Sequence, residues 1–232
     1  MSIRKKMNHT CYKCDEPATS TEHVPPRCLF PKQKDSIAKL NLRKNLITVP
    51  SCDMHNSHKS KDDEYLFFVL VSTVNGNKVS SNLFQKTLIR AFQRKPHVYK
   101  SFFTPNKEIF LQNDQGIFQK TLGINIDVPR FNRIIEQVAS ALLFHHYQTK
   151  WISGHVRVLS NILLDTTTQE METINRTIAS GTERIKNTVH YLKATGENSL
   201  VFEYKAARTS GQYMFVMSFY GGIQVAVMLD SV

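Results

Sequence analysis

The chain has 232 residues, a hydrophobic content of 41% and a formal net charge of +11. This composition excludes a disordered polypeptide, and the length accommodates one sizeable domain or a small module followed by a larger one. Residues 1–61 carry 12 Lys and Arg against 5 Asp and Glu, so seven of the surplus positive charges lie there. That surplus favours a polyanionic partner, with nucleic acid first and an acidic membrane surface second. A basic surface that only confers solubility is the alternative.

The four cysteines are Cys11, Cys14, Cys28 and Cys52. The N-terminus is polar and basic and lacks the apolar segment of a signal peptide, so we expect a cytoplasmic protein with reduced thiols. Two pairs with two intervening residues, Cys11 with Cys14 and Cys52 with His55, can close one tetrahedral zinc site. Cys28 is a rival fourth ligand, but it lacks this spacing and is expected to be a small buried residue.

The segment between the two pairs predicts a strand, a loop, a second strand and a short helix. The strands are expected at residues 21–24 and 46–49, with Pro50 ending the second one. Between them, residues 27–45 are polar and rich in Lys and Arg, which suits a loop along a phosphate backbone. A short helix is expected over about 52–59. With zinc ligands at both ends, this order predicts a ββα-metal unit.

The rest of the chain predicts an α+β domain with no internal repeat. Helices are expected over about 60–74, 81–93, from Asp127 onward and over 168–179, and strands at 108–112, 117–121, 155–164, 188–193, 200–206, 212–219 and 223–229. The apolar run from Tyr213 to Leu229 contains polar residues and glycines. It therefore predicts two strands around Gly221 and Gly222, and no membrane span.

For two of these helices, the sequence predicts which side chains are buried and which are exposed. Tyr65, Phe67 and Phe68 are expected in the core. The helix after Asp127 is expected to bury one face at helical spacing, made of Phe131, Ile134, Ile135, Val138 and Leu142. His145 and His146 at its far end are expected to be surface residues. A second metal site there is disfavoured because no acidic partner is near in the sequence.

Three short motifs together resemble those of a known enzyme family. Glu22-His23, Asn45-Leu46 and Cys52-x-x-His55-Asn56 follow Cys11-x-x-Cys14 in the order found in HNH endonucleases (His-Me finger, ββα-metal) of the zinc-knuckle type. The resemblance covers about residues 9–64. It departs from the usual pattern in two places. His55 replaces the more usual cysteine, and Glu22 stands where Asp is commoner.

The resemblance implies a role for each matched residue. His23 would be the general base that takes a proton from the attacking water. Glu22 and Asn56 would hold one catalytic divalent cation, Mg²⁺ or Mn²⁺, and Asn45 would hold the loop and the histidine in place. The structural zinc would be bound by Cys11, Cys14, Cys52 and His55.

Physical chemistry agrees with these roles. A histidine with an ordinary pKa is partly neutral at physiological pH and can accept a proton. Mg²⁺ prefers oxygen ligands, such as carboxylate, amide and phosphate oxygens. Arg27, Lys32 and Lys59 are expected to contact phosphate, with solvated surface charges as the alternative. His58 matches no required position and is expected to be a bystander.

We therefore expect an α+β protein with an HNH module and the following helix in residues 1–78, and a mixed helical and β domain of unassigned role in residues 79–232. The expected activity is endonucleolytic hydrolysis of DNA, more than of RNA. By analogy with bacterial conflict systems, the setting would be defence. One alternative is a non-catalytic, zinc-stabilised nucleic-acid-binding module. The other is a nuclease subunit that needs a partner protein or a second copy, docked through the C-terminal domain.

Overall fold

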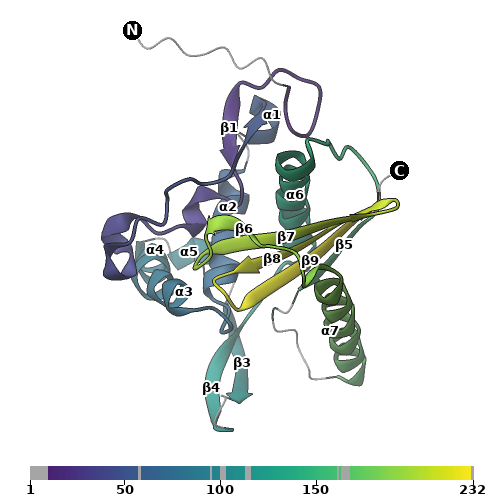
Figure 1. The fold of residues 1–232 in the computed structure, drawn as a ribbon. Helices are drawn as coiled ribbons and strands as arrows, with labels where there is room; N and C mark the ends of the chain where they lie inside the picture. The colour runs from purple at the N-terminus through teal and green to yellow at the C-terminus, as the bar shows by residue number, and fades with distance from the viewer. Residues whose placement is uncertain are drawn as a thin grey trace.

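The computed structural model describes residues 10–56, 59–94, 96–99, 103–112, 116–160, 162 and 168–230. The fold is α+β, as predicted. Within the described residues, two two-stranded antiparallel sheets accompany a five-stranded antiparallel sheet and several helices (Figure 1).

The N-terminal part begins with β1 (Ser20–His23), which pairs antiparallel with β2 (Thr48–Ser51). Between them the chain makes three 3-10 turns, η1 (Arg27–Leu29), η2 (Gln33–Asp35) and η3 (Ile37–Lys39), and β2 leads into the short helix α1 (Asp53–Asn56). The expectation that Pro50 ends the second strand was wrong, since Pro50 pairs with Thr21 inside β2. A two-stranded sheet has only edge strands, and an edge tolerates a proline.

Helix α2 (Ser60–Val71) is surrounded by protein from Tyr65 to its end. All seven residues from Tyr65 to Val71 are buried, which confirms the predicted core positions of Tyr65, Phe67 and Phe68. A helix that is apolar on every side belongs in a core, since no polar face remains for water. Its neighbour is α6 (Val128–Tyr147), whose Arg130 forms an ion pair with Asp62 of α2 at 2.7 Å.

The next helical path runs through α3 (Lys78–Leu83), the π-helical segment η4 (Phe84–Leu88) and α4 (Ile89–Arg94). The helix predicted over 81–93 is therefore present and begins three residues earlier. It starts there because the Asn77 side chain caps it, accepting hydrogen bonds from the amides of Val79 and Ser80. Helix α5 (Pro96–Tyr99) follows.

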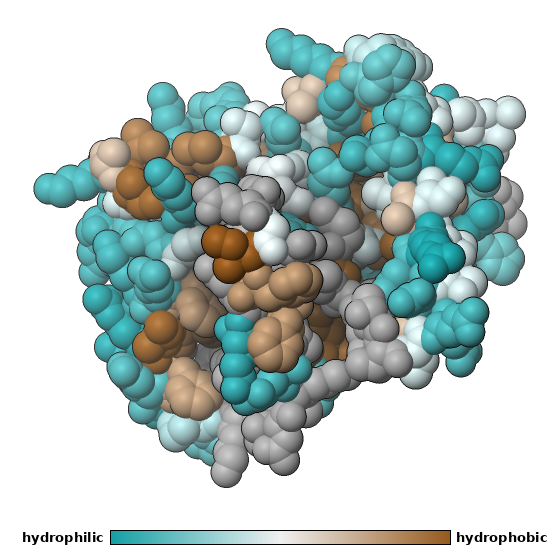
Figure 2. All heavy atoms as spheres, turned by 90° about the horizontal axis from the view of Figure 1, so that it is seen from below, coloured by the Kyte–Doolittle hydropathy of each residue, from teal (hydrophilic) through white to brown (hydrophobic). Residues whose placement is uncertain are grey.

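The predicted hairpin is formed by β3 (Phe103–Gln112) and β4 (Phe118–Ile124), and it projects from the body of the molecule (Figure 1). Figure 2 views the molecule from this side, where hydrophobic residues lie among hydrophilic ones. Phe110 and Phe118 are each 64% exposed. Their register, Phe110 opposite Lys120 and Phe118 opposite Gln112, places both phenylalanines on one face of the hairpin.

The five-stranded sheet has the order β5-β9-β8-β7-β6. Its strands are β5 (Val156–Ser160), β6 (Thr195–Asn198), β7 (Phe202–Thr209), β8 (Gln212–Phe219) and β9 (Ile223–Asp230). Helix α6 packs on one face and α7 (Gln169–Val189) on the other (Figure 1). Along β8, Phe215 lies in the main core while Met214 and Val216 meet α7. Both faces are covered, which explains the consecutive apolar residues from Tyr213 to Met217 in β8.

The strand predicted at 188–193 was wrong, because α7 continues to Val189 and β6 begins only at Thr195. Thr182, Ile185 and Val189 are the buried residues of α7, at helical spacing. Burial of this stripe against the sheet extends the helix ten residues beyond the predicted end. The predicted turn between β8 and β9 is confirmed and contains Gly221 and Gly222.

The main hydrophobic core takes side chains from both sides of the expected boundary at residue 78. Val24, Leu29 and Phe68 belong to the same buried cluster as Phe215 and Tyr220. Within the described part of the chain, no helix combines the length and the apolar character that a bilayer crossing requires.

Candidate metal centre and catalytic site

Four side chains converge at one point between the first turn and α1. The ligand atoms of Cys11, Cys14, Cys52 and His55 all lie within 4.8 Å of one another. The Sγ atoms of Cys14 and Cys52 are 3.8 Å apart, and His55 Nδ1 lies 3.2–3.5 Å from the three sulfurs. Around a tetrahedral zinc ion, these separations are about 3.8 Å for two sulfurs and about 3.5 Å for sulfur and nitrogen. The cluster can hold a metal ion, and its spacing is compatible with zinc.

Backbone hydrogen bonds bring the two halves of this cluster together. The Cys11 amide donates to the Glu16 carbonyl at 2.8 Å, which closes the first turn. The next amide, that of Tyr12, donates to the Pro50 carbonyl of β2 at 2.8 Å. Cys52 follows β2 directly, so pairing the turn with β2 delivers all four ligands to one place.

Cys28 lies outside this cluster. Its thiol donates to the Asp63 carbonyl at 3.4 Å, and the residue as a whole is exposed. The expectation of a buried residue was therefore wrong, because Cys28 occupies the exposed 3-10 turn η1 and not a strand or helix facing the core.

Glu22 projects from β1 into a second polar cluster. The Lys59 ammonium donates to Glu22 Oε1 at 2.6 Å and to the hydroxyl of buried Tyr12 at 2.9 Å. The Lys59 side chain is only 13% exposed, so it lies in an internal ion pair and not on an open surface. The second oxygen, Glu22 Oε2, is buried and has no hydrogen-bond partner among the described residues.

Asn56 lies on the same side of β1 as Glu22. Its Nδ2 donates to the Ser20 hydroxyl at 2.8 Å. Because alternate residues of a strand share a face, Ser20 and Glu22 project together towards α1. The structure therefore brings the two expected cation ligands, Glu22 and Asn56, to one face.

His23 is the last residue of β1, and strand alternation directs it to the face opposite Glu22. Its Nδ1 is buried and has no hydrogen-bond partner in the described part of the chain. Burial lowers the pKa of His23 below its ordinary value of 6.5, and the positive charges of Arg27 and Arg43 lower it further. The lowered pKa favours the neutral form of the ring, which is the form that can accept a proton.

Arg43 is a candidate functional residue that sequence reasoning did not select. Its Nε donates to the Phe30 carbonyl at 2.8 Å, which fixes the guanidinium beside η1. The charges of Arg27 and Arg43 both act on His23, and such a concentration of positive charge suits an anion. The one sequence signal was its position two residues before Asn45. Lys32, the other expected phosphate contact, is exposed at the start of η2.

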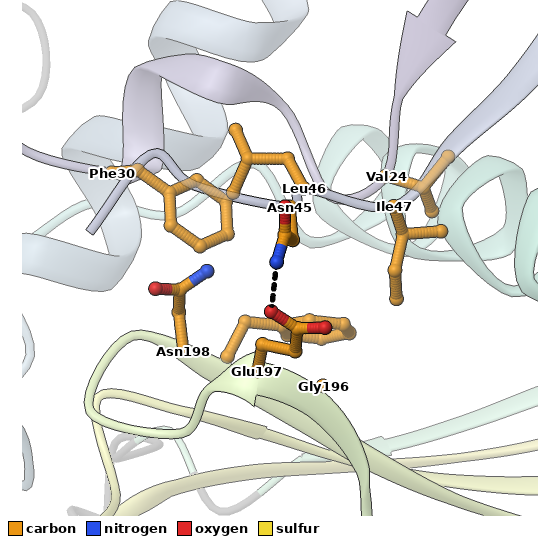
Figure 3. Close-up of a pocket in the computed structure, with 9 residues that line it drawn as sticks. Val24, Phe30, Asn45, Leu46, Ile47, Gly196, Glu197 and Asn198 are labelled. Carbon is orange, nitrogen blue, oxygen red and sulfur yellow. Dashed lines mark hydrogen bonds between the residues drawn. The ribbon is translucent and has the colours of Figure 1, made fainter. Parts of the chain in front are cut away.

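Asn45 does not contact His23 through its amide in the described structure. It adopts the left-handed conformation (φ 51°), and its Nδ2 donates to Glu197 of the large sheet (Figure 3). Asn198 Nδ2 donates to the Lys44 carbonyl at 2.8 Å beside this contact. Asn45, which was expected to hold the loop and His23 in place, is thus hydrogen-bonded to a strand 152 residues away in the sequence.

The histidines at the end of α6 are exposed, as expected for surface residues. The Nδ1 of His146 lies 3.2 Å from the hydroxyl of Tyr204, so this ring has a partner in the sheet. Among the described residues, the one group of His, Cys, Asp and Glu side chains placed to hold a metal ion is the Cys/His cluster. His58 lies outside the described residues.

Comparisons with protein-family models, curated proteins and solved structures found no match to this chain.

Proposed function

We propose that this protein is a metal-dependent endonuclease that hydrolyses phosphodiester bonds in DNA, with β1, β2 and α1 forming an HNH-type module around a structural zinc ion. The observation that carries the proposal is the arrangement around β1. The Cys/His cluster joins α1 to the first turn, Glu22 and Asn56 share one face of β1, and His23 ends this strand in the field of two arginines.

His23 accepts the proton of the attacking water in this proposal. Partial burial lowers the pKa of His23, and the neighbouring cations lower it further, which favours the neutral form that a general base needs. Arg27 and Arg43 neutralise the phosphate and its developing charge, since guanidinium groups bind phosphate oxygens well. An anion at this position would also relieve the repulsion between the two guanidinium groups.

Glu22 and Asn56 would hold the divalent cation. Their carboxylate and amide oxygens are the donors that Mg²⁺ and Mn²⁺ prefer, and the buried Glu22 Oε2, which has no hydrogen-bond partner among the described residues, is the carboxylate oxygen left for a cation. When bound, such a cation stabilises charge on the phosphate and on the leaving oxygen. Lys59 orients the carboxylate through its other oxygen, and the Tyr12 hydroxyl holds Lys59 by accepting a second hydrogen bond from its ammonium.

The zinc ion would be structural. Three thiolates and one imidazole complete a tetrahedral coordination shell, which leaves no position for water or substrate. Its contribution would be to hold α1, and with it Asn56, against the turn that contains Cys11 and Cys14.

The test is a cleavage assay on supercoiled DNA, single-stranded DNA and RNA, with Mg²⁺ or Mn²⁺ restored after EDTA treatment. We expect His23→Ala to reduce cleavage by more than about 100-fold, the lower end of what a general base contributes. Zinc content and melting temperature should stay at wild-type values. His190→Ala, which changes an exposed histidine of the sheet domain, is the matched control and should cut normally. Wild-type rates for His23→Ala would refute the proposal.

One observation favours a second function, a zinc-stabilised module that binds nucleic acid without cutting it. Lys59 already neutralises the Glu22 carboxylate, and His23 lies on the opposite face of β1. In that case DNA binding would weaken steeply with rising salt, as expected for contacts to phosphates, and no divalent cation would produce cleavage.

The third function carried forward is a nuclease subunit that needs a partner. The projecting β3–β4 hairpin supports it, because two exposed phenylalanines, Phe110 and Phe118, lie on one of its faces. Activity that appears only after co-purification and is lost in a Phe110→Ser, Phe118→Ser double variant would favour this function.

A further inference from the structure

Residues 196–202, here called the corner, comprise the end of β6 and the turn into β7, and they contact the loop that precedes β2. Glu197 accepts a hydrogen bond from Asn45 Nδ2, and Asn198 Nδ2 donates to the Lys44 carbonyl at 2.8 Å. Figure 3 shows the two side chains of the corner pointing towards the loop from the large sheet. Two consecutive residues of the corner therefore hold two consecutive residues of the loop.

The other end of the same loop is also attached to the large sheet. The hydroxyl of Tyr220, in the turn between β8 and β9, donates to the Leu29 carbonyl at 2.7 Å. This bond is fully buried, and burial keeps the Tyr220 hydroxyl protonated by raising its pKa well above 10. The sheet thus holds the Lys- and Arg-rich loop of residues 27–45 at Leu29 and again at Lys44 and Asn45.

The contact at the corner leaves little space between the two segments. The cavity between the two segments measures about 10 Å³, roughly the space of one water molecule. Gly196 has a φ of +134°, and a Cβ atom there would lie 2.8 Å from the Phe202 carbonyl oxygen. This glycine allows the close turn that presents Glu197 and Asn198 to the loop, so the corner is built as an attachment point.

The attached residues lead directly to the catalytic groups. Arg43 precedes Lys44, and its Nε is held by the Phe30 carbonyl on the other side of the loop. On the other side of Asn45, the carbonyl of Ile47 accepts the amide of Val24, the residue after His23. The corner therefore acts on a segment that connects the phosphate-binding arginine to the end of β1.

We propose that Glu197 and Asn198 are positioning residues of the nuclease site, which hold Arg43 beside His23 through Lys44 and Asn45. This inference rests on the proposed function and deepens it. It assigns to the C-terminal sheet the task of completing the site. Neither residue touches substrate, so the effect passes through the loop.

The test uses Glu197→Ala, Glu197→Gln and Asn198→Asp in the full-length, zinc-loaded chain. Glutamine can still accept the hydrogen bond from Asn45, whereas alanine cannot, and aspartate cannot donate to the Lys44 carbonyl. We expect Glu197→Ala and Asn198→Asp each to lower kcat about tenfold with little change in KM, and Glu197→Gln to stay within about twofold. Glu183→Ala on α7 is the control and should match wild type.

A second measurement is independent of catalysis. Amide hydrogen exchange over residues 40–48 should be faster in Glu197→Ala and Asn198→Asp, and unchanged in Glu197→Gln. In an Arg43→Ala background, Glu197→Ala should lower kcat by less than about twofold further, because the group that it positions is already gone.

These measurements separate the two proposals. A wild-type chain that never cleaves would refute the proposed nuclease and the positioning role together, whereas hydrogen exchange would still report the attachment. If wild type cleaves and Glu197→Ala cleaves equally fast, the positioning role is refuted while the nuclease stands. Equal losses from Glu197→Ala with and without Arg43 would also refute it.

Discussion

At the scale of single residues, one substitution tests whether the Cys/His cluster binds zinc. Cys14→Ser removes one of the four converging ligands. We expect the zinc bound per chain to fall close to zero and the melting temperature to drop by roughly 10 °C or more, because metal binding contributes directly to folding. Metal analysis and thermal unfolding measure both effects.

Cys28→Ser is the matched control for this loss, since Cys28 lies outside the cluster and on an exposed turn. It should keep its zinc and its melting temperature. A Cys14→Ser protein that retains a full equivalent of zinc would contradict the assigned ligand set.

Asp63 carries a residue-scale prediction about pH. Burial raises the pKa of this carboxyl to about 6, with Lys59 opposing the shift and Glu22 adding to it. A folded-state pKa above the unfolded value stabilises the fold fully at low pH, and this contribution is lost as the pH rises through about 6. Asp63→Asn should therefore raise the free energy of unfolding by about 1–2 kcal/mol at pH 8 and leave it nearly unchanged near pH 4.

Urea unfolding at the two pH values measures this difference. Asp62→Asn is the control. The neighbouring Asp62 is paired with Arg130 at 2.7 Å, so neutralising it removes an ion pair and should not raise the free energy of unfolding. If Asp63→Asn raises the free energy of unfolding equally at both pH values, the buried charge of Asp63 is not the cause of the change.

At the scale of elements, Tyr220 ties the turn between β8 and β9 to η1. Tyr220→Phe leaves the Leu29 carbonyl without its donor in a buried position. We expect a loss of about 1–2 kcal/mol in the free energy of unfolding, the usual consequence of an unsatisfied buried polar group. Tyr191→Phe, at a tyrosine that is 72% exposed, should change stability little when both are measured by urea unfolding. Equal urea midpoints for Tyr220→Phe and Tyr191→Phe would contradict a stabilising hydrogen bond between Tyr220 and Leu29.

At the scale of the whole molecule, the shared core predicts that residues 1–78 do not fold alone. In the 232-residue chain α2 is buried from Tyr65 to Val71, and part of its cover comes from α6. The isolated fragment would expose this apolar helix, so we expect aggregation or a poorly dispersed NMR spectrum even with zinc. A monomeric fragment with a well-dispersed spectrum would support the domain boundary predicted at residue 78 and contradict this expectation.

Local patterns in the sequence were sufficient for several parts of this protein. The spacing of Cys11, Cys14, Cys52 and His55 identified the cluster, because metal ligands come in short-range pairs whose geometry depends on few residues. The α+β class, the buried face of α6 and the β8–β9 turn also followed from periodicity and turn residues. The length of α7 did not, since its last three turns depend on burial against the sheet.

Only the tertiary structure decided what surrounds the expected catalytic residues. The sequence did not disclose that Lys59 pairs with Glu22, that Arg43 acts on His23, or that Asn45 reaches Glu197. These contacts join segments separated by up to 152 residues. Such pairs are brought together by packing of the whole core, and no local spacing or propensity encodes which polar side chains it will place side by side.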